Sequence, residues 1–175
     1  MKPIDDYVRG LESFRLLSHS TGGLIAEFLA GADRRVYLSP WGAFTGICGI
    51  RSSRSPCGSR CRGRSSRTAG PTGRCWGALA TDRQLADTPS RVAPTFLREA
   101  KRAQSRLPPF QFEEAGVVFY TPTVPVVSTT AIERRTPESN RVVYEGGHQL
   151  FDSPSRETHV EPFLAALEDG PDALE

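Results

Sequence analysis

The 175-residue sequence contains no apolar run near the length of about 18 residues that a membrane-spanning helix requires. Its first six residues include a lysine, a proline and two aspartates, so they lack the apolar stretch of a secretory signal peptide. We therefore expect a cytoplasmic protein with no membrane span. The length is sufficient for one domain with a hydrophobic core.

Residues 46–75 lack acidic residues, aromatic residues and any apolar periodicity, although they hold seven of the 22 basic residues and all four cysteines. A segment of this composition cannot bury enough apolar surface to offset the entropy lost on ordering, and we expect it to be disordered. The rest of the chain carries 15 basic and 20 acidic residues, a net charge of −5. The overall net charge of +2 is therefore no indication of a nucleic-acid partner, and none is expected.

Three functions of this basic segment are disfavoured by what it lacks. Without aromatic side chains it has nothing on which RNA bases would stack. The gaps between its cysteines are eight, three and thirteen residues, with no C-x-x-C pair and no nearby histidine, which disfavours zinc. Structural disulfides require an oxidising compartment that nothing else indicates. The abrupt change of composition is typical of a GC-rich gene translated out of frame, which is the interpretation we prefer and which the encoding DNA can test.

The most informative stretch is an apolar segment that runs into a small-residue turn and then into a helical pattern. Residues 13–17 can form a short buried strand, and apolar residues recur at helical spacing over 24–29. Between them lies the pattern S-x-S-x-G, with Ser20 at its centre. A serine lifted off a strand end at the start of a helix exposes its Oγ, and the amide N–H groups behind it face any negative charge that forms there. The alternative is a serine- and glycine-rich turn that opens an ordinary amphipathic helix.

In its order of strand, turn and helix, this stretch resembles the nucleophile elbow of the α/β-hydrolase superfamily, in which His-Ser-Thr-Gly-Gly is a familiar form. The resemblance implies that Ser20 is the nucleophile and that the backbone N–H of Thr21 is one oxyanion donor. It covers about residues 1–44 and 76–170, which correspond to the C-terminal part of such a hydrolase. It also implies that the first four strands are absent, and with them the loop that supplies the second oxyanion donor.

The other elements are predicted from apolar patterns, from proline and glycine stops and from capping residues. Residues 5–13 are expected to form the end of a helix. Further helices are expected from Thr21 to about Gly31, over 77–86, over 94–106 and from near Ser128. Strands are expected over 36–38, 116–120 and 141–144. A final helix is expected to stop near Gly170, with its inward residues being Val160, Phe163, Leu164 and Leu167.

Three histidines are candidates for the general base that a serine nucleophile needs. His19 lies inside the turn beside Ser20, with its side chain expected to project away from the serine, and His159 lies on the final helix. His148 follows a strand and two glycines and precedes the final helix. A loop histidine is ordinarily a solvated residue. This order and place match those of the superfamily's general base, however, so the resemblance assigns that role to His148.

The carboxylate that would hold this histidine has no intact candidate. The resemblance places it in the loop after the penultimate strand, at the position of Val124, and valine cannot perform this role. Glu133, nine residues further on, is a displaced alternative. The more ordinary interpretation of Glu133 is a solvated helix residue paired with Arg134 or Arg135. We expect no intact catalytic triad.

The sequence therefore predicts an α/β protein: a partial α/β-hydrolase fold with a parallel sheet and flanking helices, the N-terminal strands missing and a disordered segment in the lid region. Its parts, all of one incomplete domain, are the nucleophile turn and following strand (1–45), the disordered segment (46–75), lid-like helices (76–110) and the C-terminal strands, histidine loop and last helix (111–170). A parallel sheet without half of its strands exposes an apolar edge, which provides a route to self-association.

The resemblance implies the activity of a serine esterase or lipase-like hydrolase: acyl transfer to water through Ser20 and His148, on a small-molecule ester or acyl substrate. No metal or organic cofactor is implied. Because of Val124 and the absent oxyanion loop, we expect weak activity or none. Two alternatives stay open. One is a non-catalytic hydrolase-like pseudoenzyme or binding module that contacts acidic partners through the arginine-rich segment. The other is a spurious reading frame with no stable product.

Overall fold

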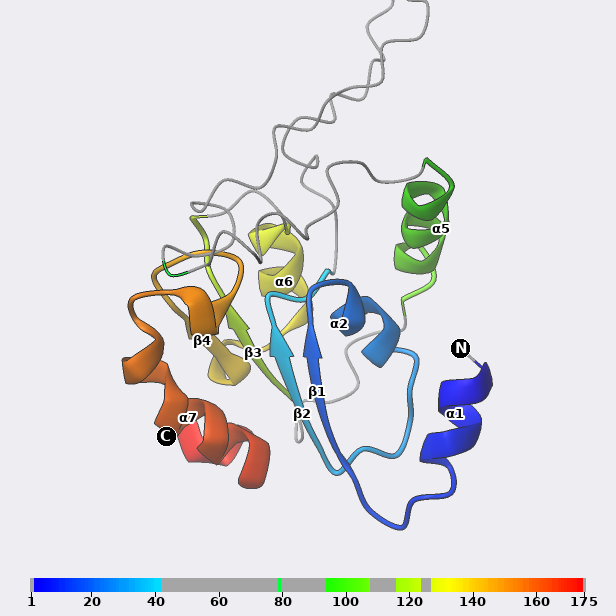
Figure 1. The fold of residues 1–175 in the computed structure, drawn as a ribbon, viewed down its shortest axis with the longest axis horizontal. Helices are drawn as coiled ribbons and strands as arrows, with labels where there is room; N and C mark the ends of the chain where they lie inside the picture. The colour runs from blue at the N-terminus through cyan, green and yellow to red at the C-terminus, as the bar shows by residue number, and fades with distance from the viewer. Residues whose placement is uncertain (1, 42–78, 80–93, 108–115, 124–126, 175) are drawn as a thin grey trace, which may run out of the picture.

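In a computed structural model of the chain, the described residues are 2–41, 79, 94–107, 116–123 and 127–174. The segment 46–75 and the helix expected over 77–86 lie outside these ranges, except for Leu79. Figure 1 shows the helices and strands of the described chain. In chain order they are α1 (Lys2–Val8), β1 (Arg15–His19), α2 (Thr21–Ala26), β2 (Arg34–Leu38), α5 (Pro94–Gln104), β3 (Gly116–Tyr120), α6 (Thr129–Arg135), β4 (Arg141–Val143) and α7 (Arg156–Glu168), with short 3₁₀ turns η1 (Glu138–Asn140), η2 (Leu150–Asp152) and η3 (Pro171–Leu174).

The four strands form one parallel sheet in the order β1-β2-β3-β4, so each strand pairs with its neighbour in the chain (Figure 1). The register aligns Leu17 of β1 with Val36 of β2, and Val36 with Val117 of β3. Because all four strands run the same way, their carboxyl ends meet at one edge of the sheet. The prediction of a parallel sheet with flanking helices is confirmed at this level.

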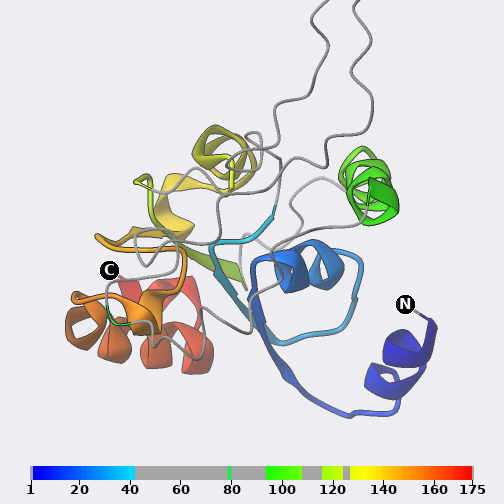
Figure 2. The same ribbon diagram turned by 45° about the horizontal axis from the view of Figure 1, so that its top comes forward.

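Two apolar clusters fill the two faces of the sheet, and Figure 2 shows α2 and α7 on opposite sides. The cluster under α2, α5 and α6 contains Leu24, Ala26, Tyr37, Trp41, Ala100, Val118, Tyr120, Val127 and Ile132. The cluster under α7 contains Val36, Leu38, Val117, Phe119, Tyr144, Leu150, Phe163 and Ala166. Successive residues of β2 and β3 alternate between the clusters, which is the two-residue period of a strand with both faces buried.

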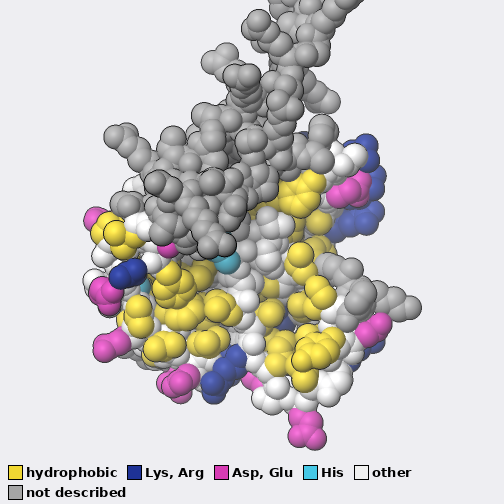
Figure 3. Space-filling view, viewed as in Figure 1, with side chains coloured by type: hydrophobic (Ala, Val, Ile, Leu, Met, Phe, Trp, Pro, Cys, Tyr) yellow, Lys and Arg dark blue, Asp and Glu magenta, His cyan; other side chains and the backbone are white. Residues whose placement is uncertain are grey.

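The outer strands are less covered than the central two. Leu17 in β1 is 49% exposed and Val143 in β4 is 53% exposed. Further exposed apolar side chains are those of Ile4 and Tyr7 in α1, Leu11 after α1 and Ile25 in α2. Figure 3 shows hydrophobic side chains at the surface over much of the lower half of the view. Self-association through an exposed sheet edge stays a prediction. No helix in the described part of the chain is long and apolar enough to cross a membrane.

Helix α2 ends earlier than the sequence predicts, at Ala26 instead of near Gly31. The N–H groups of Phe28 and Leu29 donate to carbonyls only three residues back, so the last turn tightens and the helix cannot continue. The fully buried guanidinium of Arg35 in β2 then takes the carbonyls of Ala26, at 3.1 Å, and Leu29, at 2.7 Å. A charged side chain from the next strand thus completes the end of this helix.

Other element boundaries differ from the predictions by a few residues. The strand expected over 13–17 is β1, Arg15–His19, which continues up to the serine turn. The helix expected over 5–13 is α1, which ends at Val8. In α7 the prediction that Leu164 faces inward is wrong, because that side chain is 49% exposed, whereas Phe163 and Ala166 are buried one turn apart. The strand over 116–120 and the Ser128 cap, whose side chain accepts from the Ala131 N–H, are confirmed.

We expect Arg35→Leu to lower the free energy of unfolding by about 2–4 kcal/mol, because it removes the guanidinium donor from the Leu29 carbonyl and leaves the Ala26 carbonyl with only the Leu29 N–H. Urea denaturation followed by circular dichroism measures the change. The matched control is Arg15→Leu, the same substitution at an exposed position of β1, which should change stability by less than about 0.5 kcal/mol. Equal losses in the two variants would contradict the role given to Arg35.

Candidate functional site

Ser20 stands between the last residue of β1 and the first residue of α2, with φ 52° and ψ −117°. A positive φ is unfavourable for any residue with a side chain and persists only where the surroundings impose it. Here the N–H of Ser20 donates to the Leu38 carbonyl at 3.0 Å, and the Ser20 carbonyl accepts from the Trp41 N–H at 2.9 Å. Leu38 is the last residue of β2 and Trp41 follows it by three residues, so the neighbouring strand and the turn after it hold Ser20 in this conformation. The Ser20 side chain is half-buried.

The close approach in the turn falls on a glycine that the S-x-S-x-G pattern does not contain. A Cβ on Gly23 would lie 2.6 Å from the Pro40 Cβ, which is closer than real contacts allow. A Cβ on Gly22 would meet the Ser18 Cβ at 3.9 Å, an ordinary contact. Gly23 is therefore the residue that lets α2 pack on the turn after β2. The second glycine of His-Ser-Thr-Gly-Gly is the signal that could have identified it.

His148 lies in the loop after β4, and the structure brings it to the turn at the end of β1. The ring centroids of His19 and His148 are 4.7 Å apart. The Nε2 of His19 lies 3.3 Å from the His148 carbonyl oxygen, across 129 residues of chain. Since a carbonyl only accepts, this Nε2 is the protonated nitrogen of His19. The sequence predicts that the His19 side chain projects away from Ser20, and this stays a prediction. In the structure the His19 ring contacts His148.

The His148 loop is held in place through its backbone carbonyls. Side-chain hydroxyl groups from outside and within the loop donate to successive carbonyls: Ser155 to Glu145, Thr121 and Thr123 to Gly146, Tyr144 to Gly147 and His148, and Ser153 to Gln149. Gly146 has φ 148°, and a Cβ there would collide with Ser153. The conformation of this loop is therefore specified by its neighbours, and Gly146, the first of the two glycines before His148, is required for its packing against Ser153.

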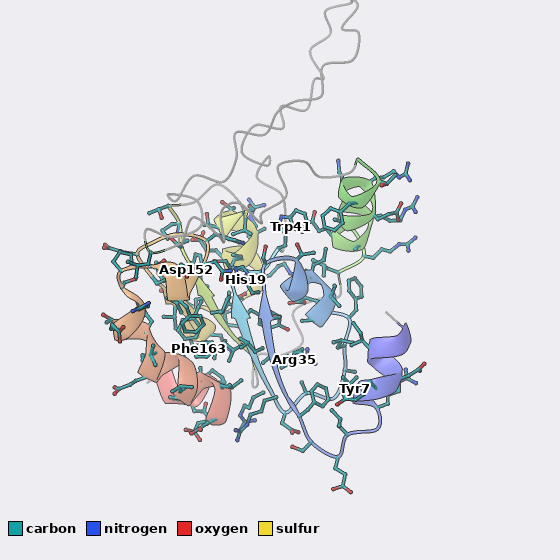
Figure 4. The ribbon with its side chains drawn as sticks, in the orientation of Figure 1. Tyr7, His19, Arg35, Trp41, Asp152 and Phe163 are labelled. Atoms are coloured by element: carbon teal, nitrogen blue, oxygen red, sulfur yellow. The ribbon has the colours of Figure 1, made fainter. Side chains whose placement is uncertain are left out.

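Burial governs the protonation of both histidines. His148 is 4% exposed, and burial, with a smaller contribution from His19, lowers its pKa to about 3. Burial also lowers the pKa of His19, opposed by its hydrogen bond to the His148 carbonyl and by the charge of Asp152. Figure 4 shows His19 and Asp152 near one another at the carboxyl ends of the strands. At neutral pH both imidazoles are therefore uncharged.

Among the described residues, no contact is found between the Glu133 carboxylate and His148. Glu133 lies on α6, and its Oε1 accepts from the Tyr120 hydroxyl at 3.2 Å. Arg135 forms a 2.9 Å ion pair with Glu27, and no ion pair within the described part of the chain joins Glu133 to Arg134 or Arg135. Val124 lies outside the described residues. The acid role of Glu133 stays a prediction.

Thr21 is the first residue of α2. Its N–H is one of the first four of that helix, which have no acceptor within the helix. His159 lies on α7 with its ring 6.1 Å from the Tyr144 ring. Among the described residues, no three histidine, cysteine, aspartate or glutamate side chains come together as a metal centre.

Comparison with protein-family models and with curated proteins finds no match to this chain.

The strain at Ser20 can be measured by substitution. Both Ser20→Gly and Ser20→Ala remove the hydroxyl group, but only glycine adopts a positive φ without steric cost. We expect the glycine variant to be more stable than the alanine variant by about 1–2 kcal/mol. Chemical denaturation of the two purified variants gives the difference. An alanine variant as stable as the glycine variant would show that the turn is not strained.

The stability of the protein should fall as the pH drops below about 6.5. The unfolded chain binds a proton on His148 near the ordinary pKa of 6.5, whereas the folded protein binds one only near pH 3. Between these values the unfolded state holds more protons, so stability is full above pH 6.5 and is lost by up to about 1.4 kcal/mol per unit of falling pH. Urea denaturation at pH 7, 6 and 5 measures this slope.

Two variants test whether the burial of His148 causes this dependence of stability on pH. His148→Gln should flatten it, because the buried imidazole that cannot take a proton is gone. The same substitution at His159, which is only half-buried on α7, is the control and should retain the slope. If His148→Gln retains it as well, burial of His148 is not its source.

Proposed function

We propose that this chain is a serine hydrolase of the carboxylic-ester type, in which Ser20 is the nucleophile and His148 the general base, acting on a small-molecule ester or acyl substrate. The observation that carries the proposal is the conformation of Ser20, with φ 52° at a strand-to-helix turn that two backbone hydrogen bonds enforce. Strained backbone of this kind concentrates at functional sites. The resemblance of the turn to the α/β-hydrolase elbow and the approach of His148 to His19 support the same assignment.

In the proposed reaction, the Ser20 Oγ attacks the substrate carbonyl carbon while its proton passes to the His148 imidazole. The negative charge on the carbonyl oxygen is stabilised by the N–H of Thr21, at the start of α2. Collapse of the tetrahedral intermediate expels the alcohol, which takes the proton from His148. Water then repeats the attack on the acyl-enzyme, with His148 again as base, and releases the acid and free Ser20.

We expect this activity to be weak, for two physical reasons. A general base must hold the proton during the reaction, and burial makes the charged form of His148 unfavourable, with a pKa of about 3. The carboxylate that would stabilise the imidazolium is also not supplied by Glu133 in its described contact with Tyr120. Attack by Ser20 should therefore be much slower than in a hydrolase with a complete triad.

A hydrolase-like pseudoenzyme is the second candidate, and the same contact of Glu133 favours it. A fold can keep the strained turn and the histidine loop after catalysis has been lost. In that case binding through the arginine-rich segment would be the remaining function. Its affinity for acidic partners should fall steeply with rising salt, whereas acylation of Ser20 should not.

The test is covalent labelling of the purified chain with a fluorophosphonate, followed by intact mass and peptide mapping. We expect one adduct per chain, on Ser20, formed slowly and absent from Ser20→Ala. Ser139→Ala is the matched control at an exposed serine of η1 and should label like the unmodified chain. Introducing Val124→Asp, at the acid position that the resemblance assigns, should raise the labelling rate.

The outcomes separate the two candidates. A stoichiometric Ser20 adduct that Ser20→Ala abolishes supports the hydrolase. A folded circular-dichroism spectrum without any adduct rejects it and supports the pseudoenzyme. Rapid turnover of a short-chain p-nitrophenyl ester, dependent on Ser20, would contradict the expected impairment.

A further inference from the structure

The hydroxyl group of Tyr144 stands at the centre of the His148 loop. Tyr144 follows β4 directly and is 1% exposed. Its Oη lies 3.0 Å from the Gly147 carbonyl, 3.1 Å from the His148 carbonyl and 3.0 Å from the Ser39 Oγ. The function proposed above does not use this side chain. A buried phenol with three oxygen neighbours, one of them the carbonyl of the candidate base, requires an explanation.

The direction of each hydrogen bond follows from the number of protons available. A tyrosine hydroxyl has one proton, and the two carbonyls can only accept, so Tyr144 donates toward Gly147 and His148. The remaining bond must then run from the Ser39 hydroxyl to the Tyr144 oxygen. Ser39 is fully buried, which makes this donor-acceptor chain inaccessible to competing water. The chain runs in one direction, from Ser39 through Tyr144 to the loop.

Ser39 also connects this chain to the serine turn. It lies between Leu38 and Trp41, whose backbone groups bond to the N–H and carbonyl of Ser20. Its own N–H donates to the Phe119 carbonyl at 2.7 Å, and its φ is 42°. The segment 38–41 therefore holds the nucleophile turn through its backbone and the His148 loop through the Ser39 side chain. Relative placement of the two loops depends on this segment.

We propose that Tyr144 is a positioning residue for His148, and that Ser39 orients the Tyr144 hydroxyl so that it fixes the His148 carbonyl beside the Ser20 turn. The inference rests on the proposed function for the role of His148 as base, but the placement itself does not. His19 contributes a second donor to the same carbonyl from β1, at 3.3 Å. Two donors, one at the end of each outer strand of the sheet, thus meet on one atom of the candidate base.

In the described part of the chain, His148 contacts His19 from β1 and Tyr144 from the end of β4, and the carboxylate of Asp152 in η2 acts on His19. Burial raises the pKa of Tyr144 to about 12, so the phenol keeps its proton at any working pH. The tyrosine therefore acts as a fixed donor and not as a titrating group. Removing its hydroxyl should loosen the loop and admit water to the imidazole.

Two variants and a control test the proposal. Tyr144→Phe removes the donor to the loop, and Ser39→Ala removes the group that orients it. Tyr37→Phe deletes the same hydroxyl from a buried tyrosine of β2 whose side chain packs on the opposite face of the sheet. The first readout is the titration of the His148 imidazole by NMR, with its signals assigned among the three histidines by single substitutions. The second is the rate and pH profile of fluorophosphonate labelling at Ser20.

We expect Tyr144→Phe to raise the His148 titration midpoint by at least about one pH unit toward the ordinary value, because solvation favours the charged form. Labelling should slow about 10- to 100-fold through misplacement of the base. Ser39→Ala should act in the same direction with a smaller effect, and it decides the question if Tyr144→Phe does not fold. Tyr37→Phe should change neither readout.

The imidazole readout keeps the two proposals apart. If the unmodified chain is not labelled but Tyr144→Phe still shifts the His148 titration, the hydrolase proposal fails and the positioning by Tyr144 stands. If the His148 midpoint in Tyr144→Phe and Ser39→Ala equals that of the unmodified chain, the positioning proposal is overturned, whatever the labelling shows.

Discussion

The two backbone hydrogen bonds from the end of β2 to Ser20 are the constraint on which the site depends. In one, the Ser20 N–H donates to the Leu38 carbonyl. In the other, the Trp41 N–H donates to the Ser20 carbonyl. Together they force the chain out of β1 and directly into α2, with a dihedral pair that a serine would not choose alone. The direction of α2 and its close packing on Pro40 follow from that turn. A local strain is thus stabilised by a neighbouring strand and not by the turn residues themselves.

Burial has opposite consequences for two polar side chains of this fold, Arg35 and His148. Arg35 is buried but has fixed carbonyl partners, so its charge contributes to structure. Burial, with a smaller contribution from His19, lowers the pKa of His148 to about 3. The fold stabilises a neutral, precisely placed imidazole at the cost of its basicity. Placement and proton affinity, which catalysis needs together, are opposed in this site.

The sequence was sufficient for features that depend on a few adjacent residues. The strand over 116–120 and the Ser128 cap could be predicted because β-branched runs and capping side chains act locally. The contact of His19 with His148 and the completion of α2 by Arg35 could not. Each is set by a residue from another element, so no periodicity or motif in the local sequence reports it. The S-x-S-x-G pattern correctly located a turn but not the reasons that hold it.

The order β1-β2-β3-β4 has a consequence for how the molecule folds. Each strand can add to the growing sheet as the next element in the chain, so every pairing closes only the segment between neighbours. The contact of His19 with His148 joins residues 129 apart and can form only after all four strands are in place. Because the entropic cost of closure precedes the reward of such a contact, we expect the histidine pair to be the last part of the sheet edge to assemble and the first to open. We therefore expect the candidate site to form in the last step of folding.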